Sequence, residues 1–112
     1  MAVDQADVID VAGISNSTGE MVLTISDHLD WSNTIEHQTV LQKKLNAYLA
    51  FVESGEVFQK FPDAKDRSIV FRVVFKFKPD KEGSLFLIRA RAVIESAGFG
   101  FNHEIFAESY GN

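Results

Sequence analysis

The residue types most able to do chemistry gather in one short stretch, Asp27–Trp31, and continue soon after it at Glu36 and His37. This region holds two imidazoles and three carboxylates. Because imidazole titrates near neutral pH, such groups can perform acid–base chemistry or bind a metal ion. The two His residues lack the i, i+4 spacing that marks a metal-binding pair on a helix. The candidate functional cluster is Asp27, His28, Asp30, Trp31, Glu36 and His37.

A plainer interpretation of the same cluster is the start of a helix. Asn33 can cap this helix, and Glu36 stands three residues later, where its side chain can reach back to the capping residue. Acidic side chains are also favoured near the positive end of a helix. In this interpretation Asp30 helps Asn33 to cap, and Trp31 packs at the edge of a layer. We favour it because loops that lead into helices are polar for capping alone, but the functional alternative stays open.

Other motif-like stretches predict no chemistry. Gly98–Phe101 is rich in glycine, but it follows a predicted helix and so cannot present helix N-terminal amides to a phosphate. Glu53–Glu56 indicates a helix end, and His103 is a lone residue of a predicted strand. The chain has no cysteine, which excludes disulfides, thiol catalysis and sulfur-ligated metals. With no catalytic triad spacing, P-loop or dinucleotide fingerprint in the sequence, we expect no cofactor and no metal.

Alternation of apolar and polar residues predicts four strands. The clearest is Ser68–Phe77, and the others are Asp7–Ile14, Glu20–Ser26 and Phe99–Glu108. The first two in chain order are joined by a turn that contains Gly19, which predicts an antiparallel hairpin. The apolar residues expected on one side of the clearest strand are Ile69, Phe71, Val73, Phe75 and Phe77.

Two amphipathic helices are predicted between the strands. The first begins after Asn33 and ends before Gly55, and the second runs from Pro79-Asp80 to about Ala97. In both, apolar residues recur with a period of about 3.6. The first stripe is Leu41, Leu45, Tyr48, Leu49 and Val52. The second stripe is Phe86, Ala90, Val93, Ile94 and Ala97.

The order strand, strand, helix, strand, helix, strand predicts an α+β fold. Each helix lies between two strands, so each can form the crossover that joins parallel strands. We expect a two-layer sandwich, with a four-stranded mixed sheet and both helices on one face. The length fits a single domain over residues 1–112, in which ten Phe supply much of the core. We expect residues 1–5 and 109–112 to be flexible tails.

Charge is distributed unevenly along the chain. Up to Gln42 there are seven acidic residues and no Lys or Arg, whereas Lys60–Arg91 holds nine basic and four acidic residues. The two parts either neutralise each other in the fold, which we favour, or form separate patches for a partner. The net charge of −5 argues against nucleic acid as a partner. Without an apolar run of membrane-spanning length or a secretory signal, we expect a soluble cytoplasmic protein with no membrane partner.

The stretches Val22–Trp31, Glu36-His37 and Leu41–Leu49, followed by Glu53–Glu56 and Ala97–Phe99, resemble a family of small uncharacterised bacterial proteins. The resemblance covers most of the chain. It implies a bacterial cytoplasmic protein of unknown function, and it assigns no activity and no catalytic residue.

These observations favour a protein-interaction module over an enzyme. The partner is either another protein or, because one face of the predicted sheet is left uncovered, a second copy in a homodimer. The alternative is a metal-binding protein or an enzyme that uses Asp27, His28, Asp30 and His37. The two hypotheses differ in whether these four side chains converge in one concave pocket.

Overall fold

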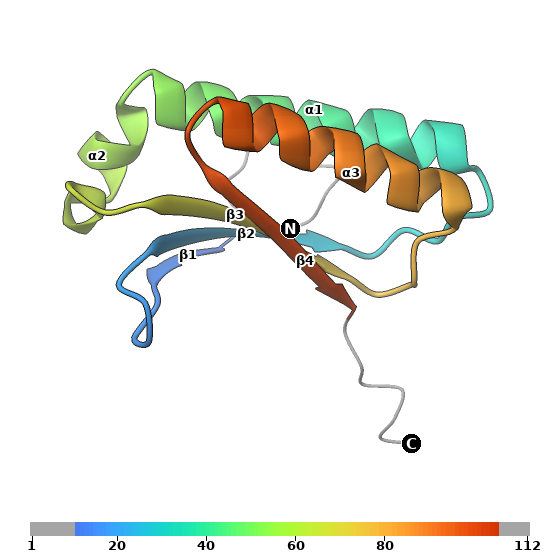
Figure 1. The fold of residues 1–112 in the computed structure, drawn as a ribbon, viewed down its shortest axis with the longest axis horizontal. Helices are drawn as coiled ribbons and strands as arrows, with labels where there is room; N and C mark the ends of the chain where they lie inside the picture. Colours follow the sequence, from blue (N-terminus) through green and yellow to red (C-terminus); the bar gives the residue numbers. More distant parts are fainter. Residues whose placement is uncertain (1–10, 106–112) are drawn as a thin grey trace.

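The computed structural model describes residues 11–105, which fold into a four-stranded sheet covered by helices (Figure 1). The order of elements is the predicted one, with a short helix and a 3₁₀ turn between the first long helix and the third strand. In chain order the elements are β1 (Val11–Ile14), β2 (Met21–Asp27), α1 (Thr34–Glu53), α2 (Glu56–Lys60), η1 (Pro62–Ala64), β3 (Ile69–Phe75), α3 (Lys81–Ser96) and β4 (Gly100–Ile105).

The sheet is mixed and its strands lie in chain order, β1-β2-β3-β4. β1 and β2 form the predicted antiparallel hairpin, whereas β2–β3 and β3–β4 are parallel pairs. α1 and α3 are the two crossovers, and Figure 1 shows both above the same face of the sheet. The predicted α+β two-layer sandwich is therefore confirmed.

The core lies between the sheet and the two long helices. Along β2 and β3 the side chains alternate between the helix-facing side, which is buried, and the opposite side. Leu23, Phe71 and Phe75 have no exposed surface. Each fully buried side chain of this kind contributes about 1.5–3 kcal/mol to folding, so this face of the sheet is the main source of stability.

Phe77 is an exception, and its predicted place in the core was wrong. β3 ends at Phe75, which pairs with Asp27, the last residue of β2. One more backbone hydrogen bond follows, from the Lys76 amide to the Asp27 carbonyl, and the chain then leaves the sheet because β2 offers no further partner. The Phe77 side chain is consequently 42% exposed.

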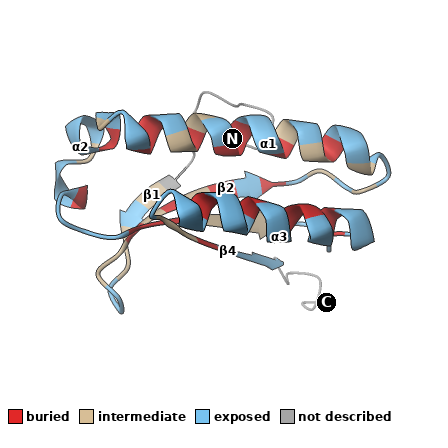
Figure 2. Ribbon diagram, turned by 45° about the horizontal axis from the view of Figure 1, so that its top comes forward, coloured by how far each residue is buried: buried red, intermediate tan, exposed pale blue. Residues whose placement is uncertain are grey.

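The two long helices bury the predicted stripes, with one correction on α3. In α1, Leu41, Leu45, Tyr48 and Val52 are buried and Leu49 is half-buried. In α3, Phe86, Ala90 and Ile94 are buried together with Gly83 and Leu87. Val93 is 60% exposed and Ala97 is also exposed, because α3 is rotated so that Leu87 faces the sheet and Ala97 lies beyond the last turn. The burial colours of Figure 2 show both helices buried toward the sheet and exposed on their outer sides.

The opposite face of the sheet has no helix over it among residues 11–105 (Figure 1). It carries a mixture of apolar and charged side chains, including Val22, Val70 and Arg72. Arg72 forms an ion pair with Glu104 on the neighbouring strand. The parts of the predicted first and last strands before residue 11 and after residue 105, and the predicted tails 1–5 and 109–112, lie outside the described residues.

Candidate functional site

The candidate cluster lies where β2 ends and α1 begins. Met21, Leu23, Ile25 and Asp27 alternate along β2 toward the helix layer and are all buried, so the strand places a carboxylate at its last core position. Residues 28–33 then turn the chain into α1. His37 lies in the first turns of α1 and faces inward, because it precedes Leu41 by four residues on the buried stripe.

Asp27 and His37 form a pair that is almost completely buried. Asp27 is 1% exposed and His37 is 2% exposed, and Asp27 Oδ2 lies 2.6 Å from His37 Nε2. His37 Nδ1 lies 2.9 Å from the backbone carbonyl oxygen of Asp30, which can only accept, so Nδ1 carries a proton and donates it. Asp27 Oδ1 accepts a hydrogen bond from the Leu29 amide at 3.1 Å.

One further proton must lie between Asp27 and His37. Two bare acceptors 2.6 Å apart would repel each other, so either Nε2 donates to the carboxylate or the carboxyl group donates to Nε2. The short distance is typical of a charge-assisted hydrogen bond. Both nitrogens of the His37 ring are therefore occupied by protein groups, and neither is available to a metal ion.

Trp31 covers the His37 ring. The two rings stack with their centroids 3.6 Å apart and an angle of 19° between their planes, and the Phe75 ring packs against both. The indole N–H donates to the Phe77 carbonyl oxygen at 3.2 Å. On the α3 side the fit is tight, since a Cβ added at Gly83 would stand 2.7 Å from Trp31 Cζ3. Trp31 is thus held by β3, by α3 and by His37 together.

The start of α3 is tied to the same place. Asp80 caps α3 by accepting a hydrogen bond from the Gly83 amide at 2.8 Å. The hydroxyl of Thr34, the first residue of α1, donates to the same Asp80 oxygen at 3.2 Å. The N-terminal ends of the two long helices are therefore joined beside Trp31.

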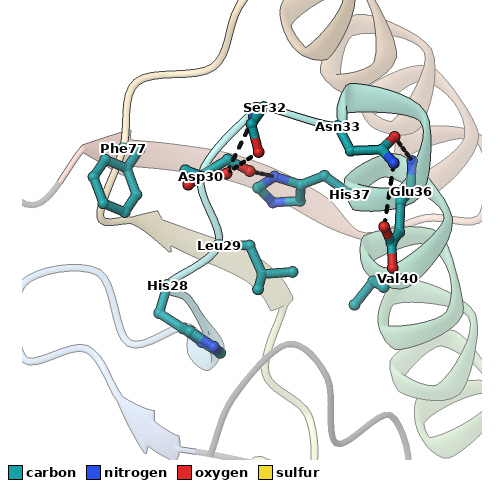
Figure 3. Close-up of a pocket in the computed structure, with 9 residues that line it drawn as sticks. All are labelled: His28, Leu29, Asp30, Ser32, Asn33, Glu36, His37, Val40 and Phe77. Carbon is teal, nitrogen blue, oxygen red and sulfur yellow. Dashed lines mark hydrogen bonds between the residues drawn. The ribbon is translucent and has the colours of Figure 1, made fainter.

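A hollow of about 470 Å³ opens next to this buried cluster (Figure 3). Most of the residues that line it are polar or charged, although the larger part of its surface is apolar, and they come from the β2–α1 loop, from α1 and from Phe77. We call it the His28 hollow; the residues that line it are His28, Leu29, Asp30, Ser32, Asn33, Glu36, His37, Val40 and Phe77.

Asp30 and Glu36 supply the carboxylates of the His28 hollow. The Asp30 carboxylate accepts hydrogen bonds from the Ser32 hydroxyl at 2.7 Å and from the Ser32 amide at 3.1 Å. These bonds hold the pKa of Asp30 below its usual value, so this carboxylate is ionised at neutral pH. Glu36 accepts a hydrogen bond from the side-chain amide of Asn33 at 3.3 Å.

A family model matches residues 1–107 of the chain and describes a family of unknown function, DUF6572. The chain belongs to the DUF6572 family. This membership agrees with the resemblance to uncharacterised proteins that the sequence showed, and the match includes every residue of the cluster. No curated protein matches the chain, and no solved structure matches it. In the described part of this DUF6572 protein, none of the helices has the length and apolar character needed to cross a membrane.

The six predicted cluster residues of this DUF6572 protein divide into two groups. Asp27 and His37 are buried and bonded to each other, with Trp31 stacked on His37, whereas His28, Asp30 and Glu36 are exposed at the hollow. The predicted helix cap is present, since Asn33 Oδ1 accepts from the Glu36 amide at 3.1 Å, although the Glu36 side chain meets the Asn33 side-chain amide and not its backbone.

The metal hypothesis finds no support at this cluster. Figure 3 shows the imidazole of His28 pointing away from that of His37. Within residues 11–105, no group of three or more His, Cys, Asp or Glu side chains is placed to hold a metal ion. The capping interpretation and the buried pair together account for most of the polar contacts around Asp27–His37.

Sequence reasoning missed three residues that matter to this region. Phe77 was expected in the core but borders the hollow, and Gly83, in the first turn of α3, makes room for Trp31. Lys44 is fully buried on α1, where its Nζ lies 5.4 Å from the centroid of the Tyr48 ring. The burial of Lys44 could have been predicted from its position three residues after Leu41, which places it on the buried stripe of the helix.

Proposed function

We propose that this DUF6572 protein is a protein-interaction domain and that the His28 hollow receives a basic side chain of its partner. The observation that carries the proposal is the charge of the lining. Asp30 and Glu36 contribute two carboxylates, and none of the described residues that line the hollow is Lys or Arg. Its volume of about 470 Å³ is within the range of ordinary binding pockets.

The other lining groups also suit a cation. The Phe77 ring is 42% exposed and presents an aromatic surface on the Asp30 side of the hollow (Figure 3). An Arg guanidinium is planar, stacks on aromatic faces and binds carboxylates through two N–H groups. Arg is therefore the partner residue that this combination fits best.

The hollow also has a rigid floor. His37 is fixed through both ring nitrogens and by the stacked Trp31, so this side of the hollow does not have to reorganise when a partner arrives. A preformed site loses less conformational entropy on binding than a flexible one. In this proposal the buried Asp27–His37 pair supports the site and does not contact the partner.

The test is a titration of the ¹⁵N-labelled full chain with two short peptides that differ in one group. The probe is acetyl-Gly-Arg-Gly-amide, and the control replaces Arg with citrulline, which has the same shape and no charge. We expect amide shifts at Asp30, Glu36 and Phe77 with the Arg peptide and none with the citrulline peptide.

A pair of variants assigns the binding to the carboxylates. Two exposed ion pairs contribute about 0.2–1 kcal/mol each, so Asp30→Asn combined with Glu36→Gln should weaken binding about two- to thirtyfold. Glu53→Gln, at an exposed position at the end of α1, should change nothing. Equal shifts with both peptides, or unchanged binding by the double variant, would contradict the proposal.

A further inference from the structure

The outer side of α3 is apolar where a surface helix is normally polar. Leu85 is 41% exposed, Ile88 is 66% exposed and Ala92 is exposed as well. At about 100° per residue, these three positions form one strip about 60° wide along the helix. We call Leu85, Ile88 and Ala92 the outer strip. It lies opposite the side that packs on the sheet, and none of the described elements covers it (Figure 2).

Single exposed apolar residues are common on protein surfaces. Aligned ones at i, i+3 and i+7 are different, because this is the spacing with which one helix packs against another. α3 is therefore apolar on two opposite sides. One apolar side packs on the sheet, and the other is available to a partner.

The charges at the two ends of the outer strip are opposite and symmetrically placed. Lys81 lies seven residues before Ile88, and Glu95 lies seven residues after it. Seven residues are close to two turns, so the three side chains follow one line along the helix. Both charged residues are exposed.

We infer that α3 is the interface of a homodimer, in which it packs antiparallel against α3 of a second copy about a two-fold axis at Ile88. The two-fold axis brings Ile88 of one chain against Ile88 of the other. It also places Lys81 of each chain opposite Glu95 of the other, and Leu85 beside Ala92, whose small side chain allows the helices to approach closely. This self-complementarity in charge and shape favours a second copy over an unrelated helix.

The dimer is expected to be weak. α3 has 16 residues and is therefore about 24 Å long. A single pair of helices of this length buries less than the roughly 1,600 Å² of a standard protein interface. The outer strip shares no residue with the His28 hollow, so the dimer and the proposed partner site can be tested separately.

The first test is sedimentation equilibrium of the full chain, with a Kd of order 100 µM expected for a weak contact of this kind. Ile88→Arg puts two like charges at the axis and should leave only monomer at concentrations of about ten times that Kd. Ile35→Arg is the matched control, because Ile35 is 73% exposed on α1 and receives the same change. It should dimerise like the wild type.

A charge exchange tests the orientation of the helices. Lys81→Glu and Glu95→Lys each place like charges together at both ends of the interface and should each raise the Kd about three- to fivefold. The double exchange restores opposite charges and should return the Kd to the wild-type value. A monomeric wild type, a dimer that survives Ile88→Arg, or a double exchange no better than the single ones would overturn the inference.

Discussion

Removing the Asp27 carboxylate while leaving His37 in place should destabilise the fold strongly. Asp27→Ala removes the acceptor of the Leu29 amide, which contributes about 1 kcal/mol. It also leaves His37 Nε2 without its partner at a position that is 2% exposed, at about 1–3 kcal/mol. With the small cavity added, the expected loss in the free energy of unfolding is about 3–5 kcal/mol, the range observed when one member of a buried pair is removed.

Asp27→Asn should destabilise the fold much less than Asp27→Ala. The difference between the two variants tests where the protons lie on the His37 ring. With Nδ1 of His37 donating to the Asp30 carbonyl, Nε2 can accept a hydrogen bond once the substitution has removed the carboxylate. The side-chain NH₂ group that this substitution introduces can donate to Nε2, while the side-chain oxygen still accepts from the Leu29 amide. We expect a loss of about 1 kcal/mol or less, because every buried polar group keeps a partner.

The assay is equilibrium unfolding in urea, followed by the fluorescence of Trp31 and by circular dichroism. Trp31 is the single Trp of the chain and stacks on His37, so its emission reports this region directly. A loss of about 3–5 kcal/mol corresponds to a fall in Tm of about 12–20 °C. Asp63→Ala, the same change at an exposed position, should stay within about 0.5 kcal/mol of the wild type. The reasoning is refuted if Asp27→Ala loses less than about 1 kcal/mol, or if Asp27→Asn is as damaging.

Gly83→Ala should destabilise by about 1–3 kcal/mol despite the better helix propensity of Ala, because its Cβ would overlap the Trp31 ring. Gly13→Ala, where a Cβ meets no atom within 4 Å, is the control, and equal stabilities would contradict the clash. Burial and the charge of Arg91 lower the pKa of His103 below 6.5, so NMR titration should show a low value that Arg91→Gln raises. Since the unfolded chain binds the proton more tightly, the stability contributed by neutral His103 is present above about pH 6.5 and should be lost as the pH falls from there through the lower pKa of the folded chain.

The sequence predicted the fold well because its strongest patterns are the regular spacings of the apolar residues that pack in the core. Alternation along Ser68–Phe77 and the 3.6-residue stripes identified the sheet core and both long helices, and the hairpin turn set the first pairing. The errors lie at the ends of elements. Phe77 was misplaced because the length of β3 depends on where β2 stops, and this is a property of the pairing and not of the local sequence.

The candidate site was predicted only in part. The cluster of polar residues was correctly located, and the Asn33 cap was expected, but the separation into a buried pair and an exposed hollow was not. Burial of Asp27 follows from the alternation of β2 continued for one more residue. Contacts of Trp31 with Phe77 and Gly83 join positions 46 or more residues apart, and no local pattern specifies them.

The parallel sheet has a consequence for how the chain acquires its structure. β2 pairs with a strand that lies 48 positions later, Met21 with Ile69, and β3 pairs with one 30 positions later, Val70 with Gly100. At a ribosomal rate of about 5–20 residues per second, β2 emerges about 2–10 s before the strand that completes it. During that interval its apolar face has only β1 and the growing α1 to pack against, which is the period when a nascent chain is most open to chaperones and to misassembly.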